Sequence, residues 1–396
     1  MRDVVVALAL RTPGGRAKKG TFRQTRPDDL GAAVIRDLLA KVPKLEPAQI
    51  GDVVLGCAMP EGEQGMNVGR NVVLLSGLPN TVPGMTVNRF CSSGLETINL
   101  GAAEIALGQS DVVIAGGVES MTLVPMGGVR YLPNPTMAAE APGTYLNMGL
   151  TAERLAERDD ITREAQDAFS YHSHMKAIAA QQAGKFDAEL VPVPTSVSEP
   201  GQNGKLVVRE VVLDRDEGPR ADTTLEALAK LKPAFKAGGT VTAGNSSQMT
   251  DGAAAVLLTT PEIAAELGLE PLARWVGYAV AGVPPEIMGI GPVEAVPKAL
   301  KRVGLTLDAM DVIELNEAFA AQSLAVLKGL GIEADDERLN ANGGAIALGH
   351  PLGCTGAKLT ATALHELRRR KGRYAMVTMC IGTGMGAAGI FEAMCG

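Results

Sequence analysis

An internal repeat is the feature that most constrains how this chain can fold. A helix-like stretch at residues 28–41 is followed by a strand-like run at 52–55, and the same order recurs at 292–303 and 311–315. The offset between the copies stays at roughly 260 residues, which indicates two similar structural units in one chain. Chance resemblance between any two α/β segments is the alternative explanation.

Each copy continues with a turn of small residues, a helix and a strand. These elements lie at 91–94, 95–105 and 111–117 in the first copy, and at 353–356, 357–370 and 374–380 in the second. The strand runs are apolar with little alternation, which indicates burial on both faces. Strands that alternate with helices then predict a mostly parallel sheet in each half.

Composition favours layered α/β packing. The chain has 396 residues, more than one hydrophobic core usually supports, so we expect two or three packed units. Aromatic residues make up only 3% and glycines number 47. We therefore expect an aliphatic core in which helices and strands approach each other closely.

The middle of the chain differs from both copies. It is rich in turns, with helix-like stretches at 150–158 and 162–183, the second of which has a cap-like start at Thr162. Such an insertion usually covers a ligand site, although it can be a passive excursion. The expected divisions are an N-terminal half in two parts, 1–121 and 241–268, an inserted loop domain at 122–240, and a C-terminal half at 269–396.

Charge and composition argue against several classes of partner. The net charge is −7 and aromatic residues are few, so nucleic-acid binding is not expected. No apolar run reaches the roughly 18–20 residues that span a bilayer, and no secretory leader precedes the strand-like start. The five cysteines are scattered, which favours free thiols in a reducing, cytoplasmic setting over a disulfide framework.

Two cysteines lie among small residues. Cys91 precedes a predicted helix, where the helix dipole and unpaired amides would lower the thiol pKa below about 8.5 and could hold an oxyanion. Cys380 ends a predicted buried strand and begins a glycine-rich turn, at the kind of strand end where α/β proteins place reactive groups. A buried structural role is the alternative for Cys91. Cys57, Cys354 and Cys395 have no such setting and are expected in the core or at the surface.

His350 is the histidine best placed for chemistry. It lies in a glycine-dense loop before Pro351, where a neutral imidazole could take a proton from a thiol, or could instead cap the next helix. His172 and His174 are expected at the surface, and His365 on a solvated helix face.

Two cofactor interpretations find little support. The glycine-rich turn after Cys380 is not followed by a helix and a later acid, so it does not fit a dinucleotide fingerprint. No Cys-x-x-Cys pair is present, so a structural zinc site is not expected.

Six blocks of sequence together resemble the thiolase family. They occur in the family order and spacing over essentially the whole chain, at 88–94, 115–121, 239–247, 316–320, 342–353 and 380–386. The resemblance implies the thiolase fold, with two duplicated α/β halves in a five-layer α-β-α-β-α arrangement and an inserted loop domain. It also implies a homodimer or homotetramer.

The resemblance implies a role for each residue of the site. Cys91 is similar to the nucleophile that carries the acyl group, His350 to the base that activates it, and Cys380 to the acid/base at the acetyl α-carbon. Asn316 resembles the residue that holds a water in one oxyanion site, and the amides of Cys91 and Gly382 resemble the other.

Coenzyme A and acyl-CoA are the implied substrates, with no permanently bound cofactor. The family suggests Arg220 near the nucleotide and Ser247 on the pantetheine. The remaining residues that it suggests along the channel are Phe235, Met148, Ala318 and Phe319.

The loop sequences favour a degradative 3-ketoacyl-CoA thiolase of fatty-acid β-oxidation. Asn147 stands where short-chain biosynthetic members tend to carry a histidine, and Thr383 stands in the second-cysteine turn where they tend to carry glycine. Acetoacetyl-CoA thiolase is the alternative.

Three other hypotheses bear on the same residues. Cys91, Asn316, His350 and Cys380 are all present, which argues against a non-catalytic member of the fold, and the Cys380 turn argues against the condensing enzymes of fatty-acid synthesis. A redox switch between the two thiols is compatible with catalysis.

Overall fold

The N-terminal half of the sheet is mixed rather than mostly parallel. The computed structural model describes residues 1–201 and 205–394. The strands of this half are β1 (Val5–Arg11), β2 (Gly15–Arg16), β3 (Ile50–Gly56), β4 (Met85–Val87), β5 (Val112–Ser120) and β8 (Thr250–Thr259). The order is β4-β3-β5-β8-β1, in which β3 is parallel to β4 and β5, while β8 is antiparallel to β5 and β1.

The C-terminal half repeats this topology. Its strands are β9 (Ala273–Gly282), β10 (Val312–Leu315), β11 (Tyr374–Ile381) and β12 (Met385–Ala393), in the order β10-β11-β12-β9. Only β10 and β11 are parallel, as β3 and β5 are in the first half. The duplication is therefore confirmed, whereas the mostly parallel sheet is wrong. In the second half a short hairpin between β11 and β12 reverses the chain direction, and in the first half β8 returns antiparallel to β5 after the long segment between them.

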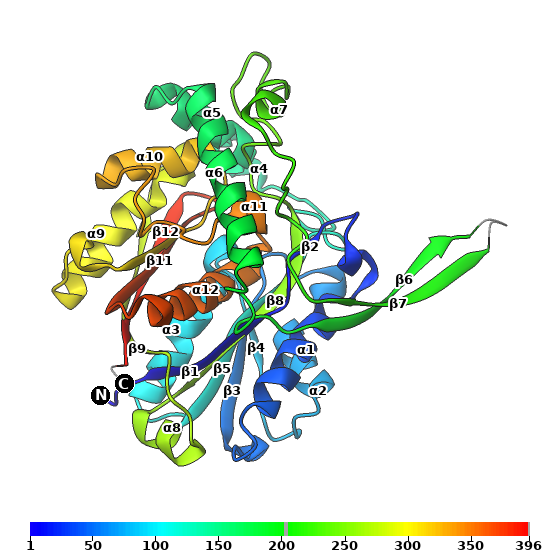
Figure 1. Cartoon of the computed structure of the whole chain (residues 1–396), viewed down its shortest axis with the longest axis vertical. Helices are drawn as coiled ribbons and strands as arrows, with labels where there is room; N and C mark the ends of the chain where they lie inside the picture. Colours follow the sequence, from blue (N-terminus) through cyan, green and yellow to red (C-terminus); the bar gives the residue numbers. More distant parts are fainter. Residues whose placement is uncertain (202–204, 395–396) are drawn as a thin grey trace.

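The helices complete five layers. They are α1 (Pro27–Ala40), α2 (Val68–Leu75), α3 (Ser93–Ala106) and α8 (Pro261–Leu267) in the first half, and α9 (Gly291–Val303), α10 (Ala320–Leu330), α11 (Ala345–Leu348) and α12 (Thr355–Arg370) in the second. Helices α3 and α12 pack against each other between the two sheets, and α1 and α9 cover the outer faces (Figure 1). The two sheets also meet at one edge, where β1 pairs with β9 at Val5–Arg274 and Val6–Ala273.

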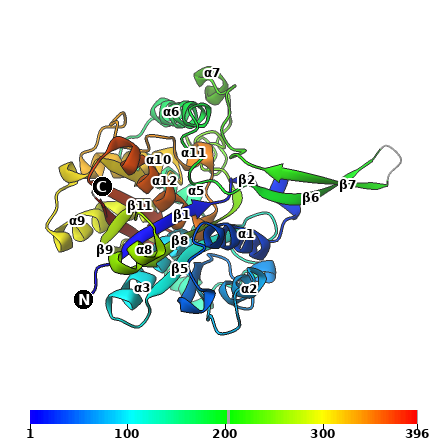
Figure 2. The same ribbon diagram turned by 60° about the horizontal axis from the view of Figure 1, so that its bottom comes forward.

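The chain between β5 and β8 forms a separate group of elements. These are α4 (Pro135–Glu140), α5 (Met148–Arg158), α6 (Arg163–Gln182), β6 (Val193–Pro200), β7 (Leu206–Leu213) and α7 (Leu225–Ala229). The expected cap of α6 is confirmed, because the hydroxyl of Thr162 accepts a hydrogen bond from the amide of Ala165. Strands β6 and β7 form an antiparallel hairpin that projects from the body of the molecule (Figures 1 and 2).

Candidate active site

The nucleophile candidate lies on a strained turn at the start of α3. Cys91 belongs to a 3-10 turn at Phe90–Ser92, and Phe90 adopts a positive φ of 43°. Burial raises the pKa of the Cys91 thiol to about 11, although the amides of Gly382 and of Cys91 itself oppose that rise. The predicted low pKa is therefore wrong, because the loss of hydration outweighs the helix terminus, and the thiol needs a base to react.

The second thiol comes from the other half of the molecule. Cys380 lies near the end of β11, and the turn that follows leads into β12 through Thr383 and Gly384, both with positive φ. This turn opens an antiparallel hairpin, not a helix. Burial, followed by the nearby charge of Cys91, raises the pKa of Cys380. Both sulfurs are thus protonated thiols at neutral pH in the free protein.

His350 is a neutral base with a defined tautomer. The Thr355 hydroxyl donates to the carbonyl of Pro351 at 3.0 Å and lies 2.6 Å from Nδ1 of His350. Because that hydroxyl has a single proton, it accepts from Nδ1–H, which leaves Nε2 as the unprotonated nitrogen. Burial, with a smaller contribution from the charge of Lys358, lowers the pKa of His350 to about 3.

Asn316 completes the arrangement around this imidazole. It follows β10, its amide donates to the carbonyl of Thr378 at 3.0 Å, and its Nδ2 lies 3.4 Å from Nε2 of His350. The carbonyl oxygen of the Asn316 side chain is buried and has no partner among the described residues. A buried acceptor of this kind suits a bound polar ligand or water.

One cavity of about 470 Å³ brings most of the predicted residues together. Those that line it are Cys91, His350, Cys380, Met148, Arg220, Phe235, Ser247, Ala318 and Phe319. Asn316 and Gly382 do not line it, but Asn316 contacts His350 and the amide of Gly382 points to Cys91. Asn147 also lines the cavity and caps α5 by accepting from the amide of Gly149.

Sequence reasoning missed two cations at this cavity. Arg16 and Lys19 line it together with Arg220, and all three side chains are exposed. The basic run at residues 16–19 was the available signal. Three cations beside an apolar channel form a surface that attracts phosphate groups.

Sequence reasoning also did not identify one buried carboxylate, that of Glu119, as a functional candidate. Glu119 accepts hydrogen bonds at 2.8 Å from the amides of Ala58 and Gly353, and at 2.7 Å from the side chain of Gln64. It therefore connects a strand of the first half to the segment of the second half that carries His350.

The expected positions of two other histidines are wrong. His174 is buried and accepts a hydrogen bond from the amide of Arg220, because the group of elements that includes α6 packs onto the body of the molecule. His365 is half-buried and bonds to the carbonyl of Ala9, because α12 is sandwiched between two sheets. His172 is exposed as expected, Cys57 and Cys354 are buried, and Cys395 lies outside the described residues.

Within the described part of the chain, no group of three or more histidine, cysteine or acidic side chains is arranged to hold a metal ion. No helix in that part is both long enough and apolar enough to cross a membrane.

Comparison with known proteins agrees with the fold. The family descriptions "Thiolase, N-terminal domain" and "Thiolase, C-terminal domain" match residues 4–262 and 269–393. The chain thus belongs to the thiolase family, and it is an acyltransferase.

Relatives are similar over nearly the whole of this chain. A 3-ketoacyl-CoA thiolase of Bacillus subtilis is 53% identical over 99% of this chain and 100% of its own length. Peroxisomal 3-ketoacyl-CoA thiolase B of Mus musculus is 50% identical, over 98% of this chain and 91% of the relative. The crystal structure of an acetyl-CoA acetyltransferase of Bacillus anthracis superposes with a TM-score of 0.89 and 42% identity, over 100% of this chain and 99% of that one.

Proposed function

We propose that this protein is a 3-ketoacyl-CoA thiolase that cleaves 3-ketoacyl-CoA with free coenzyme A, giving acetyl-CoA and a shortened acyl-CoA. The observation that carries the proposal is the cavity lined by Cys91, His350 and Cys380. The names of the Bacillus subtilis and mouse relatives support the 3-ketoacyl substrate. The name of the Bacillus anthracis protein keeps acetyl-CoA C-acetyltransferase as the second candidate.

The first half-reaction breaks the carbon–carbon bond. Nε2 of His350 takes the thiol proton of Cys91, and the sulfur attacks the 3-keto carbon. The bond between the α- and β-carbons then breaks, which leaves the acyl group on Cys91 and an acetyl-CoA enolate. The thiol of Cys380 protonates that enolate, and a raised thiol pKa suits a proton donor.

The second half-reaction regenerates the enzyme. The thiol of free coenzyme A gives its proton to the Cys380 thiolate and attacks the acyl-Cys91 carbonyl. The shortened acyl-CoA leaves, and the Cys91 sulfur recovers its proton from protonated His350. Two oxyanion sites serve these steps: the amides of Cys91 and Gly382, and the pair formed by His350 and Asn316 through water. No permanent cofactor takes part in this scheme.

The channel residues suit coenzyme A. Arg220, Arg16 and Lys19 face its phosphates, while Ser247 offers a polar partner for the pantetheine amide. Phe235 and Phe319, whose ring centroids lie 5.9 Å apart, provide an apolar wall together with Met148 and Ala318.

The setting and assembly are further parts of the proposal. Four described cysteines are buried free thiols, and catalysis requires Cys91 and Cys380 to stay reduced, which suits a reducing cytoplasm. Strand β4 ends the sheet with β3 as its neighbour, and Met66 and Leu74 nearby are exposed. These features support a homodimer or homotetramer.

Thiolysis of 3-ketoacyl-CoA substrates of increasing length tests the proposal. We expect turnover of substrates longer than acetoacetyl-CoA with ping-pong kinetics. Cys91→Ala should abolish turnover and acyl-enzyme formation by mass spectrometry, while Cys57→Ala, which removes a buried thiol outside the cavity, should retain both. Activity confined to acetoacetyl-CoA would favour the acetyltransferase, and normal turnover by Cys91→Ala would remove the nucleophile assignment.

A further inference from the structure

We propose that Glu317 is a positioning residue that holds Asn316 and the His350 segment in register with each other. The proposal rests on the thiolase function argued above. It adds a residue whose side chain does not line the reactive cavity and acts through its neighbours.

The Glu317 carboxylate accepts hydrogen bonds from three separate segments. One oxygen accepts from the hydroxyl of Ser173 on α6 at 2.6 Å and from the amide of Ile346 on α11 at 3.1 Å. The other accepts from Nδ2 of Asn340 at 2.9 Å. All three partners are donors and the group is 1% exposed, so an ionised carboxylate satisfies the set.

Asn340 extends this contact to the strand that precedes Asn316. Its side chain donates to the carbonyl of Leu315 and accepts from the amide of the same residue, each at 2.9 Å. Glu317 follows Asn316 directly in the chain, and through Asn340 it is also linked to Leu315, the residue before Asn316. Asn316 is therefore held from both sides.

The backbone before His350 is shaped to fit the same carboxylate. A Cβ atom on Gly344 would lie 2.1 Å from the carboxyl carbon of Glu317, so no larger residue fits there without a shift. The amide of Gly344 also donates to the hydroxyl of Ser173 at 3.1 Å. The two consecutive glycines before α11 therefore have a local cause: the chain must lie flat against Glu317 and α6.

These contacts end at the catalytic pair. Ile346 belongs to α11, which leads directly into His350, and Nδ2 of Asn316 lies 3.4 Å from Nε2 of His350. The two side chains come from different segments, and their geometry depends on what joins those segments. Glu317 is joined to the Asn316 segment by the chain itself and to the His350 segment by its hydrogen bond from the amide of Ile346. Misplacing a catalytic group by about 1 Å can cost about 100-fold in rate.

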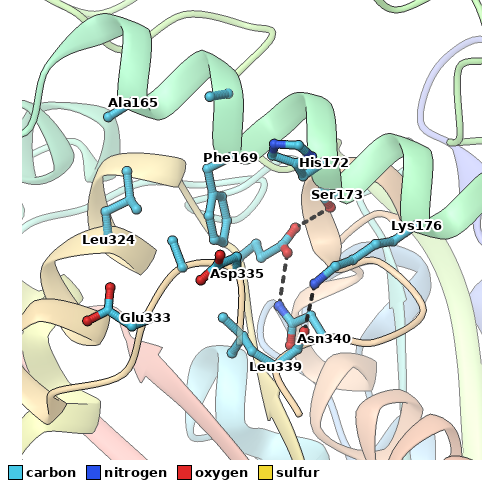
Figure 3. Close-up of a pocket in the computed structure, with 13 residues that line it drawn as sticks. Ala165, Phe169, His172, Ser173, Lys176, Leu324, Glu333, Asp335, Leu339 and Asn340 are labelled. Atoms are coloured by element: carbon cyan, nitrogen blue, oxygen red, sulfur yellow. Dashed lines mark hydrogen bonds between the residues drawn. The ribbon is translucent and has the colours of Figure 1, made fainter. Parts of the chain in front are cut away.

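Glu317 also borders a second cavity, of about 420 Å³, whose lining includes neither thiol. Figure 3 shows this cavity between α6 and the segment at 333–340. The dashed lines from the labelled Ser173 and Asn340 include their hydrogen bonds to the carboxylate of Glu317, which the figure leaves unlabelled. Because exposed residues such as His172 and Asp335 form part of its lining, water can reach the site in a variant. We therefore expect conservative replacements of Glu317 to fold.

The test compares two buried glutamates near the end of β10. In Glu317→Gln, the new NH2 group faces either Nδ2 of Asn340 or the amide of Ile346, so two donors oppose each other in both orientations. Glu314 is equally buried, but neither of its oxygens has a hydrogen-bond partner among the described residues, so Glu314→Gln is the matched control. Thiolysis kinetics and the rate of Cys91 alkylation by iodoacetamide are measured for both variants and the wild type.

For Glu317→Gln we expect kcat to fall about 10- to 100-fold, with KM for coenzyme A near the wild-type value, because the channel residues are untouched. Cys91 alkylation should slow in parallel, because it depends on His350 and requires no substrate. Glu314→Gln should match the wild type in both measurements. Wild-type kcat and alkylation in Glu317→Gln, or equal losses in the control, would overturn the proposal.

Ser173→Ala decides the matter if Glu317→Gln does not fold, because it removes one of the three donors to the carboxylate, together with the acceptor of the Gly344 amide, and leaves the carboxylate in place. A smaller fall in kcat is then expected, and wild-type kcat in the folded variant overturns the proposal. Failure of the thiolase function itself would look different. The wild type would then turn over no 3-ketoacyl-CoA, while the alkylation comparison would still report on Glu317.

Discussion

A single hydroxyl determines which nitrogen of the catalytic imidazole carries the proton. Thr355 uses its own proton on the carbonyl of Pro351, so it can only accept from Nδ1 of His350. The basic nitrogen is therefore the one beside Asn316. The sequence placed His350 in a glycine-dense loop, but its partner could not be recognised because the hydrogen bond depends on the turn at Pro351.

Replacing Thr355 by valine should impair catalysis without removing the imidazole. We expect kcat to fall by about 10- to 100-fold, a part of the 10²–10⁴ that a general base contributes, because Nδ1–H loses its acceptor. Thr355→Ser keeps the hydroxyl and should retain most activity. Thr360→Val is a control on the same helix, since the Thr360 hydroxyl donates to the carbonyl of Gly356 and has no other partner among the described residues. Equal kcat in the Thr355→Val and Thr360→Val variants would contradict the tautomer argument.

Buried histidines also link folding stability to pH. Burial, with the charges of Arg220 and Arg16, lowers the pKa of His174 to about 4 in the folded protein, below the ordinary value of 6.5. The unfolded chain therefore binds the proton more readily. The stabilisation due to neutral His174 is complete above pH 6.5 and is lost as the pH falls from 6.5 towards 4.

Urea unfolding of His174→Asn between pH 7.5 and 5 measures this effect. The variant keeps an acceptor for the amide of Arg220. Between pH 7.5 and 5, the free energy of unfolding should fall by about 2 kcal/mol more in the wild type than in this variant. His172→Asn, on the same helix but exposed, should keep the wild-type pH dependence. The same dependence in the wild type and His174→Asn would show that His174 is not the linked group.

At the scale of elements, the contact between α3 and α12 holds the two halves together. A Cβ on Gly356 would lie 2.3 Å from the amide nitrogen of Leu95, and one on Gly94 would lie 2.7 Å from the amide nitrogen of Ala357. The helices meet backbone to backbone at these glycines. The equivalent turns at 91–94 and 353–356 that revealed the duplication are thus also the place where the copies touch.

Gly356→Ala should destabilise the protein by about 1–3 kcal/mol, the usual cost of overpacking a close contact. The matched control is Gly282→Ala, because the nearest atom to a Cβ there is 4.0 Å away. Thermal unfolding monitored by circular dichroism compares the two variants. Similar midpoints would show that the helices can separate without cost.

At the scale of the whole molecule, neither half contains a complete site. Cys91 belongs to the first half, and His350, Asn316 and Cys380 belong to the second. The middle core contains side chains of α3, α12 and both sheets. A core that both halves share makes their folding mutually dependent, so we expect one cooperative transition.

Two probes can test this cooperativity. Trp275, the single tryptophan, lies on β9 with its ring centroid 5.1 Å from that of Phe391, and its fluorescence reports on the second half. Cys57 is buried in the first half outside the cavity, and its alkylation reports on exposure there. The two urea transitions should coincide, and separate midpoints would indicate halves that unfold independently.

The sequence alone indicated the duplication, the helices and most buried strands, because periodicity and small-residue turns are local properties of the chain. It also singled out Cys91, His350 and Cys380, since few thiols and imidazoles lie among glycines. Strand direction, the thiol pKa of Cys91, the burial of His174 and the partners of His350 and Glu317 were decided only by the tertiary structure. Each of these depends on desolvation or on contacts between residues far apart in the chain, which no local pattern encodes.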